Sequence, residues 1–260
     1  MVAQISSFTI QCRAIAALML FEIHTLYGDA RLGYIWALVK TAFGVLALLL
    51  LRIFAHARAP HGLPSITFLV MGFMIWQIFS QTLNKTMTVI RNNKNFLTFP
   101  QITPLDIIIA RTLVIIATEV LCAAILLCSF YLCGVLPVLQ ISDILLMLSS
   151  IFGAACFGLS CGCIFLLIGR YFPAIVRIVP IFLRILFFAS GVFFSVSTFS
   201  HRFGQWLLYN PVMQFIEMAR TAASQSYPVY YDSTYLMMVL LPLLTIGFLF
   251  ERYVRKYELT

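Results

Sequence analysis

Four charged side chains interrupt the long apolar stretches of this chain: Lys40, Arg111, Glu119 and Arg184. Charge in hydrocarbon costs about 2.5–3.5 kcal/mol on insertion scales, so such residues pair with one another, reach water or contact a substrate. Lys40 and Arg111 lie near the ends of their stretches, where long side chains extend to the interface. For Glu119 we expect an ion pair with Arg184 or Lys40, with a structural role favoured over substrate contact.

Residues that could perform catalysis are not clustered in the sequence. A phosphate-binding loop of the form Gly-x-x-x-x-Gly-Lys-Ser/Thr is absent, and so is the zinc motif His-Glu-x-x-His. The four histidines are scattered, and the seven cysteines include no Cys-x-x-Cys pair, so the thiols are interpreted as small apolar packing residues. We expect no catalytic residue, no metal site and no cofactor bound by this chain.

The composition indicates that the bilayer is the solvent of this protein. Hydrophobic residues make up 62% and charged residues 10%, against about 25% charged in typical soluble domains. The net charge of +8 is spread over short connecting segments, so membrane topology and anionic headgroups explain it better than nucleic acid does. The apolar run 14–21 is too short to span and ends at Glu22, so no cleavable signal peptide is expected.

Six stretches approach the roughly 20 apolar residues that a spanning helix needs. They are 34–51, 66–83, 105–131, 144–168, 178–198 and 234–250. With the N-terminus in the cytoplasm, ten basic residues fall in inside segments and four in outside segments, which favours both termini inside. The fold class is therefore an all-α membrane protein. Residues 1–33 form a cytoplasmic interface helix, and residues 34–260 form a single transmembrane domain.

Residues 10–30 have a helical pattern that is too short to cross the membrane. Ile10, Ala14, Leu18 and Phe21 share one face, as in a helix lying in the cytoplasmic interface. A disordered tail is the alternative.

The external segment 199–233 is moderately apolar but too short to span. After Asn210 and Pro211 it has helical spacing, which favours a re-entrant or interfacial helix in which Glu217 and Arg220 pair across one turn. Several tyrosines follow, and aromatic residues at a membrane boundary usually anchor it: Tyr227, Tyr230, Tyr231 and Tyr235.

Two spans carry patterns that bear on packing and passage. Gly158 and Gly162 form a Gly-x-x-x-Gly pair, which lets helices approach closely within or between protomers. The fifth span is rich in phenylalanine, which by default packs against lipid or the core. The sharper interpretation is a channel wall, because sugars present apolar C–H faces that stack on aromatic rings. The candidate path residues are Phe182, Phe187, Phe193 and Phe194.

Three segments resemble a known family. Residues 27–37, before the first span, are similar to the N-terminal signature of type-2 ABC exporter permeases that move polysaccharides. Residues 95–106, followed by Ala110 and Arg111, resemble the loop before the third span in the capsular-polysaccharide branch. Asn210 and Pro211, with the acidic and basic pair after them, resemble the external re-entrant segment of that family.

This resemblance implies a homodimer of the permease with two copies of a separate ATPase that binds ATP and Mg²⁺. It implies a lipid-linked polysaccharide as the substrate and periplasmic and outer-membrane export proteins as further partners, in the inner membrane of a Gram-negative bacterium. The ATPase would dock on the N-terminal helix and on the basic loop 84–104, which is alternatively a plain interface segment. The docking residues are Arg31, Lys85, Arg91, Asn95 and Phe99.

Two alternatives stay open at this point. A type-2 permease could carry another cargo, such as O-antigen, teichoic acid, a drug or haem. A membrane-embedded lipid-modifying enzyme would need clustered acid, base or metal-binding residues, and the sequence offers none.

Overall fold

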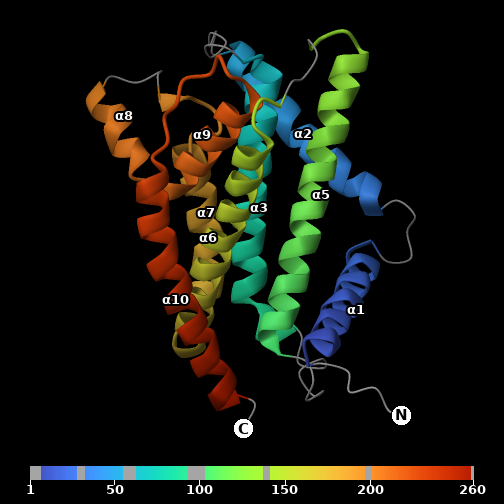
Figure 1. The fold of residues 1–260 in the computed structure, drawn as a ribbon, viewed down its shortest axis with the longest axis vertical. Helices are drawn as coiled ribbons and strands as arrows, with labels where there is room; N and C mark the ends of the chain where they lie inside the picture. The colour runs from blue at the N-terminus through green and yellow to red at the C-terminus, as the bar shows by residue number, and fades with distance from the viewer. Residues whose placement is uncertain are drawn as a thin grey trace.

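The computed structural model describes residues 7–27, 33–54, 63–92, 103–136, 141–196 and 201–258, and all regular structure in these ranges is helical. Figure 1 shows α3, α5, α6 and α10 running roughly along the longest axis of the molecule, with α2 strongly tilted to them. The helices are α1 Ser7–Tyr27, α2 Gly33–Phe54, α3 Ser65–Met87, α4 Val89–Asn92, α5 Pro104–Leu132, α6 Ile144–Tyr171, α7 Ile175–Ala189, α8 His201–Leu208, α9 Pro211–Ala223 and α10 Ser233–Glu258. The predicted all-α fold class is confirmed for the described part of the chain.

Four of the described helices are long and apolar enough to cross a membrane: α3, α5, α6 and the part of α10 from Ser233 to Val254. The shortest of these segments has 22 residues, or about 33 Å at 1.5 Å per residue, which matches a hydrocarbon core of about 30 Å. The predicted spans 66–83, 105–131, 144–168 and 234–250 each lie within one of them. A crossing by the stretch 34–51, which lies in α2, remains a prediction.

The predicted span 178–198 is wrong as a single continuous helix. Helix α7 has 15 residues, or about 22 Å, and ends at Ala189, because Gly191 adopts a φ of +79° that a right-handed helix cannot contain. Phe193 and Phe194 therefore lie in an irregular segment after the helix. Glycine is tolerated inside membrane helices, so hydropathy alone gave no sign of this break.

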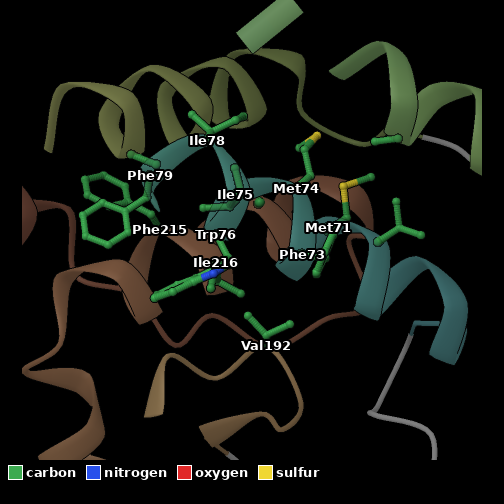
Figure 2. Packing of buried hydrophobic residues seen from close by; sticks show 14 of the residues in the cluster. Met71, Phe73, Met74, Ile75, Trp76, Ile78, Phe79, Val192, Phe215 and Ile216 are labelled. Atoms are coloured by element: carbon green, nitrogen blue, oxygen red, sulfur yellow. The ribbon is translucent and has the colours of Figure 1, made fainter. Parts of the chain in front are cut away.

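Helix α3 lies in the middle of the bundle. Its spanning window is 89% buried within the single chain, whereas that of α10 is 11% buried, so α10 presents most of its surface outward. Figure 2 shows the side chains of α3 interleaved with Phe215 and Ile216 from α9 and with Val192 from the segment after α7. The most polar of the predicted spans is thus the core helix, which explains how it tolerates Gln77 and Ser80.

The Gly-x-x-x-Gly pair of α6 packs against α3 inside one protomer. A Cβ atom on Gly158 would lie 2.6 Å from the Phe79 carbonyl oxygen, and one on Gly162 would lie 2.6 Å from Cβ of Thr86. Only glycine allows the two backbones to approach this closely. Of the two alternatives left open by the sequence, this glycine pair therefore serves packing within one protomer.

The two ends of the bundle differ in character. Helix α1, the beginning of α5 and the C-terminal end of α10 lie at one end in Figure 1, called here the α1 end. Helices α8 and α9 lie toward the opposite end, called the α9 end. Helix α9 begins with Asn210 as its N-cap, whose side chain accepts from the Val212 amide, and with Pro211 at its first turn. Nearly all of its residues are buried against α3 and α6.

The predicted helix near the N-terminus is present as α1, and its location in the cytoplasmic interface stays a prediction. Leu18 and Glu22 are buried, whereas Phe21 is 43% exposed. Leu18 packs with Ile107 and Ile108 of α5, so tertiary contact with the bundle, rather than hydrophobicity alone, selects the face. The side chain of Ile10 lies outside the described residues.

Candidate functional site

A fully buried ion pair lies at the α9 end. Arg220 donates to Glu217 at 3.0 Å, one turn apart on α9, and neither side chain has any exposed surface. The Tyr227 hydroxyl lies 2.7 Å from the second oxygen of Glu217 and 2.8 Å from Ser195 Oγ. Burial raises the pKa of the Tyr227 hydroxyl, and the Glu217 carboxylate raises it further, so the hydroxyl keeps its proton and donates to Glu217. The i,i+3 pair expected from the sequence is present.

The Arg220 guanidinium also closes the irregular segment that follows α7. It donates to the carbonyl oxygens of Gly191 at 2.9 Å and Val192 at 3.1 Å, and to that of Phe194 at 3.4 Å. Gly72 of α3 makes room for it, because a Cβ there would lie 2.7 Å from an Arg220 nitrogen. Carbonyl groups of this irregular segment thus accept hydrogen bonds from a buried cation, which lowers the cost of burying both.

Two guanidinium groups share one aromatic ring beside this pair. The Arg220 guanidinium carbon lies 3.4 Å from the centre of the Phe68 ring, and that of Arg52 lies 4.8 Å from it. Arg52 is 8% exposed and donates to the Phe193 carbonyl at 3.4 Å. The quadrupole of the ring accommodates both cations at once. This site joins α2, α3, α9 and the segment after α7. Its charged residues are buried and bonded to one another and to backbone carbonyls, which is the arrangement of a structural site.

A second charged site joins three helices at the α1 end. Arg111 of α5 donates to Glu22 of α1 at 2.9 Å, and Lys85 at the end of α3 lies 3.9 Å from the other oxygen of Glu22. Both Glu22 and Arg111 are largely buried. The first turn of α5 adds a further link, because Asp106 forms a capping box with Thr103 and accepts from Gln11 of α1 at 3.0 Å. Helix α1 is therefore fixed to α5 at both ends of their contact.

The predicted ion pair of Glu119 is wrong within the described residues. Gln81 of α3 donates to Glu119 at 2.5 Å, whereas Lys40 and Arg184 are exposed and form no ion pair with it. The Gln81 amide thus satisfies one oxygen of the Glu119 carboxylate without adding a second buried charge. Arg111, the remaining charged residue, reaches Glu22 instead of extending freely to the interface.

The structure describes two of the five predicted docking residues. Lys85 contacts Glu22 and is 39% exposed, and Arg91 is exposed on the short helix α4 beside it. Arg31, Asn95 and Phe99 lie outside the described residues.

The four candidate path residues do not form one surface. Phe182 is 56% exposed on the outer face of α7. Phe187 packs with Trp76 at 5.4 Å between ring centres and with Phe193 at 5.1 Å, so both belong to the edge of the core. Phe194 is half-buried, and its carbonyl accepts from Arg220.

One motif that the sequence analysis overlooks is Gly158-x-Ser160-x-Gly162, which matches the nucleophile pattern of serine hydrolases. Ser160 lies inside α6 rather than on a strand-to-helix turn, and it donates to the Cys156 carbonyl at 2.7 Å. The pattern is therefore packing. Among the described residues, no group of three His, Cys, Asp or Glu side chains could hold a metal ion.

Four polar residues that contact these charged groups could not be assigned from local sequence patterns: Glu22, Arg52, Gln81 and Tyr227. Three of them interrupt or end an apolar run in the sequence. Glu22 ends the apolar run of α1, Arg52 follows the apolar run of α2, and Gln81 interrupts the apolar run of α3. Tyr227 was grouped with boundary tyrosines, although it is 3% exposed. Their partners lie far away in sequence, and local patterns do not reveal such pairs.

The match to known proteins agrees with this architecture. A family model described as ABC-2 type transporter matches residues 13–223. The chain is 29% identical over 229 residues to the polysialic acid transport protein KpsM of Escherichia coli, covering 85% of each chain. It is 25% identical over 244 residues to the capsule polysaccharide export inner-membrane protein CtrC of Neisseria meningitidis, covering 94% of this chain and 91% of the relative.

A third relative has a similar description. The capsule polysaccharide export inner-membrane protein BexB of Haemophilus influenzae is 25% identical over 233 residues, covering 90% of this chain and 87% of the relative. The family model spans far more than half of the chain, in the region that holds α2 to α9 and the charged residues of both sites. The chain therefore belongs to the ABC-2 type transporter family.

Proposed function

We propose that this chain is the permease subunit of an ATP-driven exporter that moves lipid-linked capsular polysaccharide across the bacterial inner membrane. The observation that carries the proposal is the similarity, along nearly the whole chain, to relatives named as capsule export and polysialic acid transport proteins. Helices able to span a membrane support the same conclusion.

Energy would come from a separate subunit. The sequence has no phosphate-binding loop, so ATP and Mg²⁺ would bind to a partner ATPase rather than to this chain. The exposed side chain of Arg91 and the partly exposed one of Lys85 lie at the α1 end and are suited to an acidic docking surface. We assign the α1 end to the cytoplasm, which agrees with the excess of basic residues in inside segments.

The functional unit would be a homodimer. Large apolar side chains on α2 and α7 stay exposed in the single chain, among them Phe43 at 74% and Phe182 at 56%. Either lipid or a second protomer can cover such surfaces. A second protomer would also form a passage between the two copies. Periplasmic and outer-membrane export proteins would continue the path, and the segment at α9 would be re-entrant from the external side.

The proposal is tested by deleting the gene in its native host and fractionating the polysaccharide. We expect polymer to accumulate inside the cell with none at the surface, and we expect the wild-type gene to restore surface polymer. Normal surface polysaccharide in the deletion strain would overturn the proposal. A second test measures ATP turnover by the purified ATPase with and without this chain in vesicles, and the two proteins failing to associate would also contradict it.

A further inference from the structure

An open cavity of about 710 Å³ lies at the α9 end, apart from both charged sites. Helix α8, the beginning of α9, the segment 224–232 and the beginning of α10 form its walls. Its volume falls in the range of small-molecule sites, about 300–1,000 Å³. The aromatic residues that line it are Trp206, Tyr209, Tyr230, Tyr231 and Tyr235.

The walls of this cavity are held in position by hydrogen bonds. Gln214, which is 4% exposed, donates to the Leu208 carbonyl at 2.6 Å and accepts from the Asp232 amide at 2.9 Å. The Tyr235 hydroxyl donates to the Tyr209 carbonyl at 2.7 Å, which ties α10 to the end of α8. One amide side chain and one phenol therefore connect all the elements around the cavity, so its shape exists before any ligand binds.

The aromatic rings in this cavity keep their faces accessible. Trp206 is 76% exposed and Tyr209 is 68% exposed, with 6.2 Å between their ring centres at an angle of 56°. Tyr235 meets Tyr209 edge-on at 6.4 Å and 79°. Since the rings meet at steep angles rather than stacking, their faces stay free to receive another flat apolar surface.

The polar groups of the cavity distinguish it from a site for hydrocarbon. A second cavity, of about 400 Å³ between α3, α5 and α6, has almost wholly apolar walls such as Met71, Leu127 and Met147, as suits an acyl chain. The aromatic cavity instead combines tyrosine hydroxyls with the Asp232 carboxylate, one oxygen of which accepts from the Thr234 amide. Aromatic faces beside hydroxyl and carboxylate groups suit a ligand with apolar C–H faces and a rim of hydroxyls.

We propose that this aromatic cavity binds a short saccharide segment of the exported polymer as it leaves the membrane at the α9 end. The inference rests on the proposed function. Trp206 and Tyr209 stack on sugar rings, and the hydroxyls of Tyr230 and Tyr231 together with Asp232 hydrogen-bond to sugar hydroxyls. The volume fits a few sugar units rather than a folded chain, so the site holds the polymer locally while the rest of it moves.

The test uses the full chain with its ATPase partner in lipid nanodiscs and measures calorimetric binding of short oligosaccharides. These are prepared by partial hydrolysis of the surface polysaccharide of the host. We expect saturable binding to the wild type, and affinity about tenfold weaker in Trp206→Ala and in Tyr209→Ala, since each change removes one stacking ring. Trp206→Phe keeps an aromatic face and recovers part of the affinity.

The control is Tyr171→Ala, which removes an aromatic ring that is 60% exposed at the end of α6, outside both cavities. The control variant binds the oligosaccharides with wild-type affinity if the aromatic cavity is the saccharide site. Equal affinity in all variants, or no binding to the wild type, overturns the inference. Reduced membrane insertion of Trp206→Ala, with wild-type affinity in the protein that does insert, would also overturn it, because the ring would then be a boundary anchor.

The deletion experiment separates this inference from the proposed function. If the wild-type gene restores export but the purified wild-type chain binds no oligosaccharide, the cavity assignment alone is overturned. A deletion strain with normal surface polymer overturns the proposed function and the cavity assignment with it.

Discussion

Arg111 donates to Glu22 at 2.9 Å although 89 residues separate them in sequence. This contact binds the N-terminal helix to the first half of α5, and Lys85 at the end of α3 reaches the same carboxylate. A movement of α1 is therefore transmitted to two helices of the bundle by one charged group. If the ATPase docks at this end, as proposed, Glu22 is one contact through which its movement reaches the bundle, beside that of Gln11 with Asp106.

The first prediction concerns this pair. Arg111→Leu removes the donor that lies 2.9 Å from Glu22, and removal of one partner of a buried pair costs about 3–5 kcal/mol. We expect a lower thermal unfolding midpoint in detergent and loss of ATP turnover dependent on the permease. The matched control is Arg170→Leu at the exposed end of α6. An unchanged midpoint in Arg111→Leu would show that the contact contributes nothing to stability.

The helices of this protein could be predicted from the sequence because hydropathy and length determine them. The stretches 105–131 and 144–168 each lie within the observed helix, with ends that differ by at most three residues. The break after Ala189 could not be foreseen, because it depends on Gly191 and on Arg220, which binds the carbonyls there from another helix. Apolar content is continuous across the break, so local composition predicts one helix.

The charged sites were predictable only where both partners lie within one turn. Glu217 and Arg220 form the pair expected from their i,i+3 spacing. Glu119 pairs with Gln81 rather than with a cation, because helix rotation and depth decide which side chains meet across helices. A hydropathy pattern contains neither the rotation nor the depth of a helix. It also does not predict that Arg220 donates to four backbone carbonyl groups.

The second prediction addresses the exposed basic side chain on α4. Arg91→Glu reverses a charge that has no role in the contact of Glu22, so membrane insertion and thermal stability stay as in the wild type. Stimulation of the partner ATPase is expected to fall about tenfold if this charge docks on it. Arg170→Glu, another exposed change at the same end, is the control. Full stimulation by Arg91→Glu would remove this residue from the docking surface.

The third prediction tests the close approach of α6 to α3. Alanine normally favours a helix over glycine by about 1 kcal/mol, but a Cβ on Gly158 would lie 2.6 Å from the Phe79 carbonyl oxygen. The backbones must separate, so Gly158→Ala is expected to lower stability by about 1–3 kcal/mol. Gly169→Ala on the same helix meets only valine and isoleucine methyl groups, the nearest at 3.2 Å, and serves as the control. Equal unfolding midpoints for the two variants would contradict the packing argument.

The fourth prediction separates charge from geometry at Arg220. Arg220→Lys keeps the positive charge but loses the planar fork that reaches Glu217 and the carbonyls of Gly191 and Val192. We expect a loss of about 3 kcal/mol, seen as a low yield of monodisperse protein and a lower unfolding midpoint. Tyr227→Phe removes one donor to Glu217 and should cost about 1–2 kcal/mol. A wild-type yield and unfolding midpoint in Arg220→Lys would mean that a positive charge alone is sufficient to stabilise the site around Glu217.

The fifth prediction distinguishes passage from packing among the phenylalanines of α7. Phe187 contacts Trp76 and Phe193, so Phe187→Ala is expected to lower stability by about 3–5 kcal/mol, and its effect on export cannot be assigned to a pathway. Phe182 is 56% exposed, so Phe182→Ala leaves the fold intact. Reduced export by a stable Phe182→Ala protein would therefore identify a surface that the polymer touches. Ile181→Ala, at 58% exposed on the same helix, is the control, and equal export by both variants would remove Phe182 from the path.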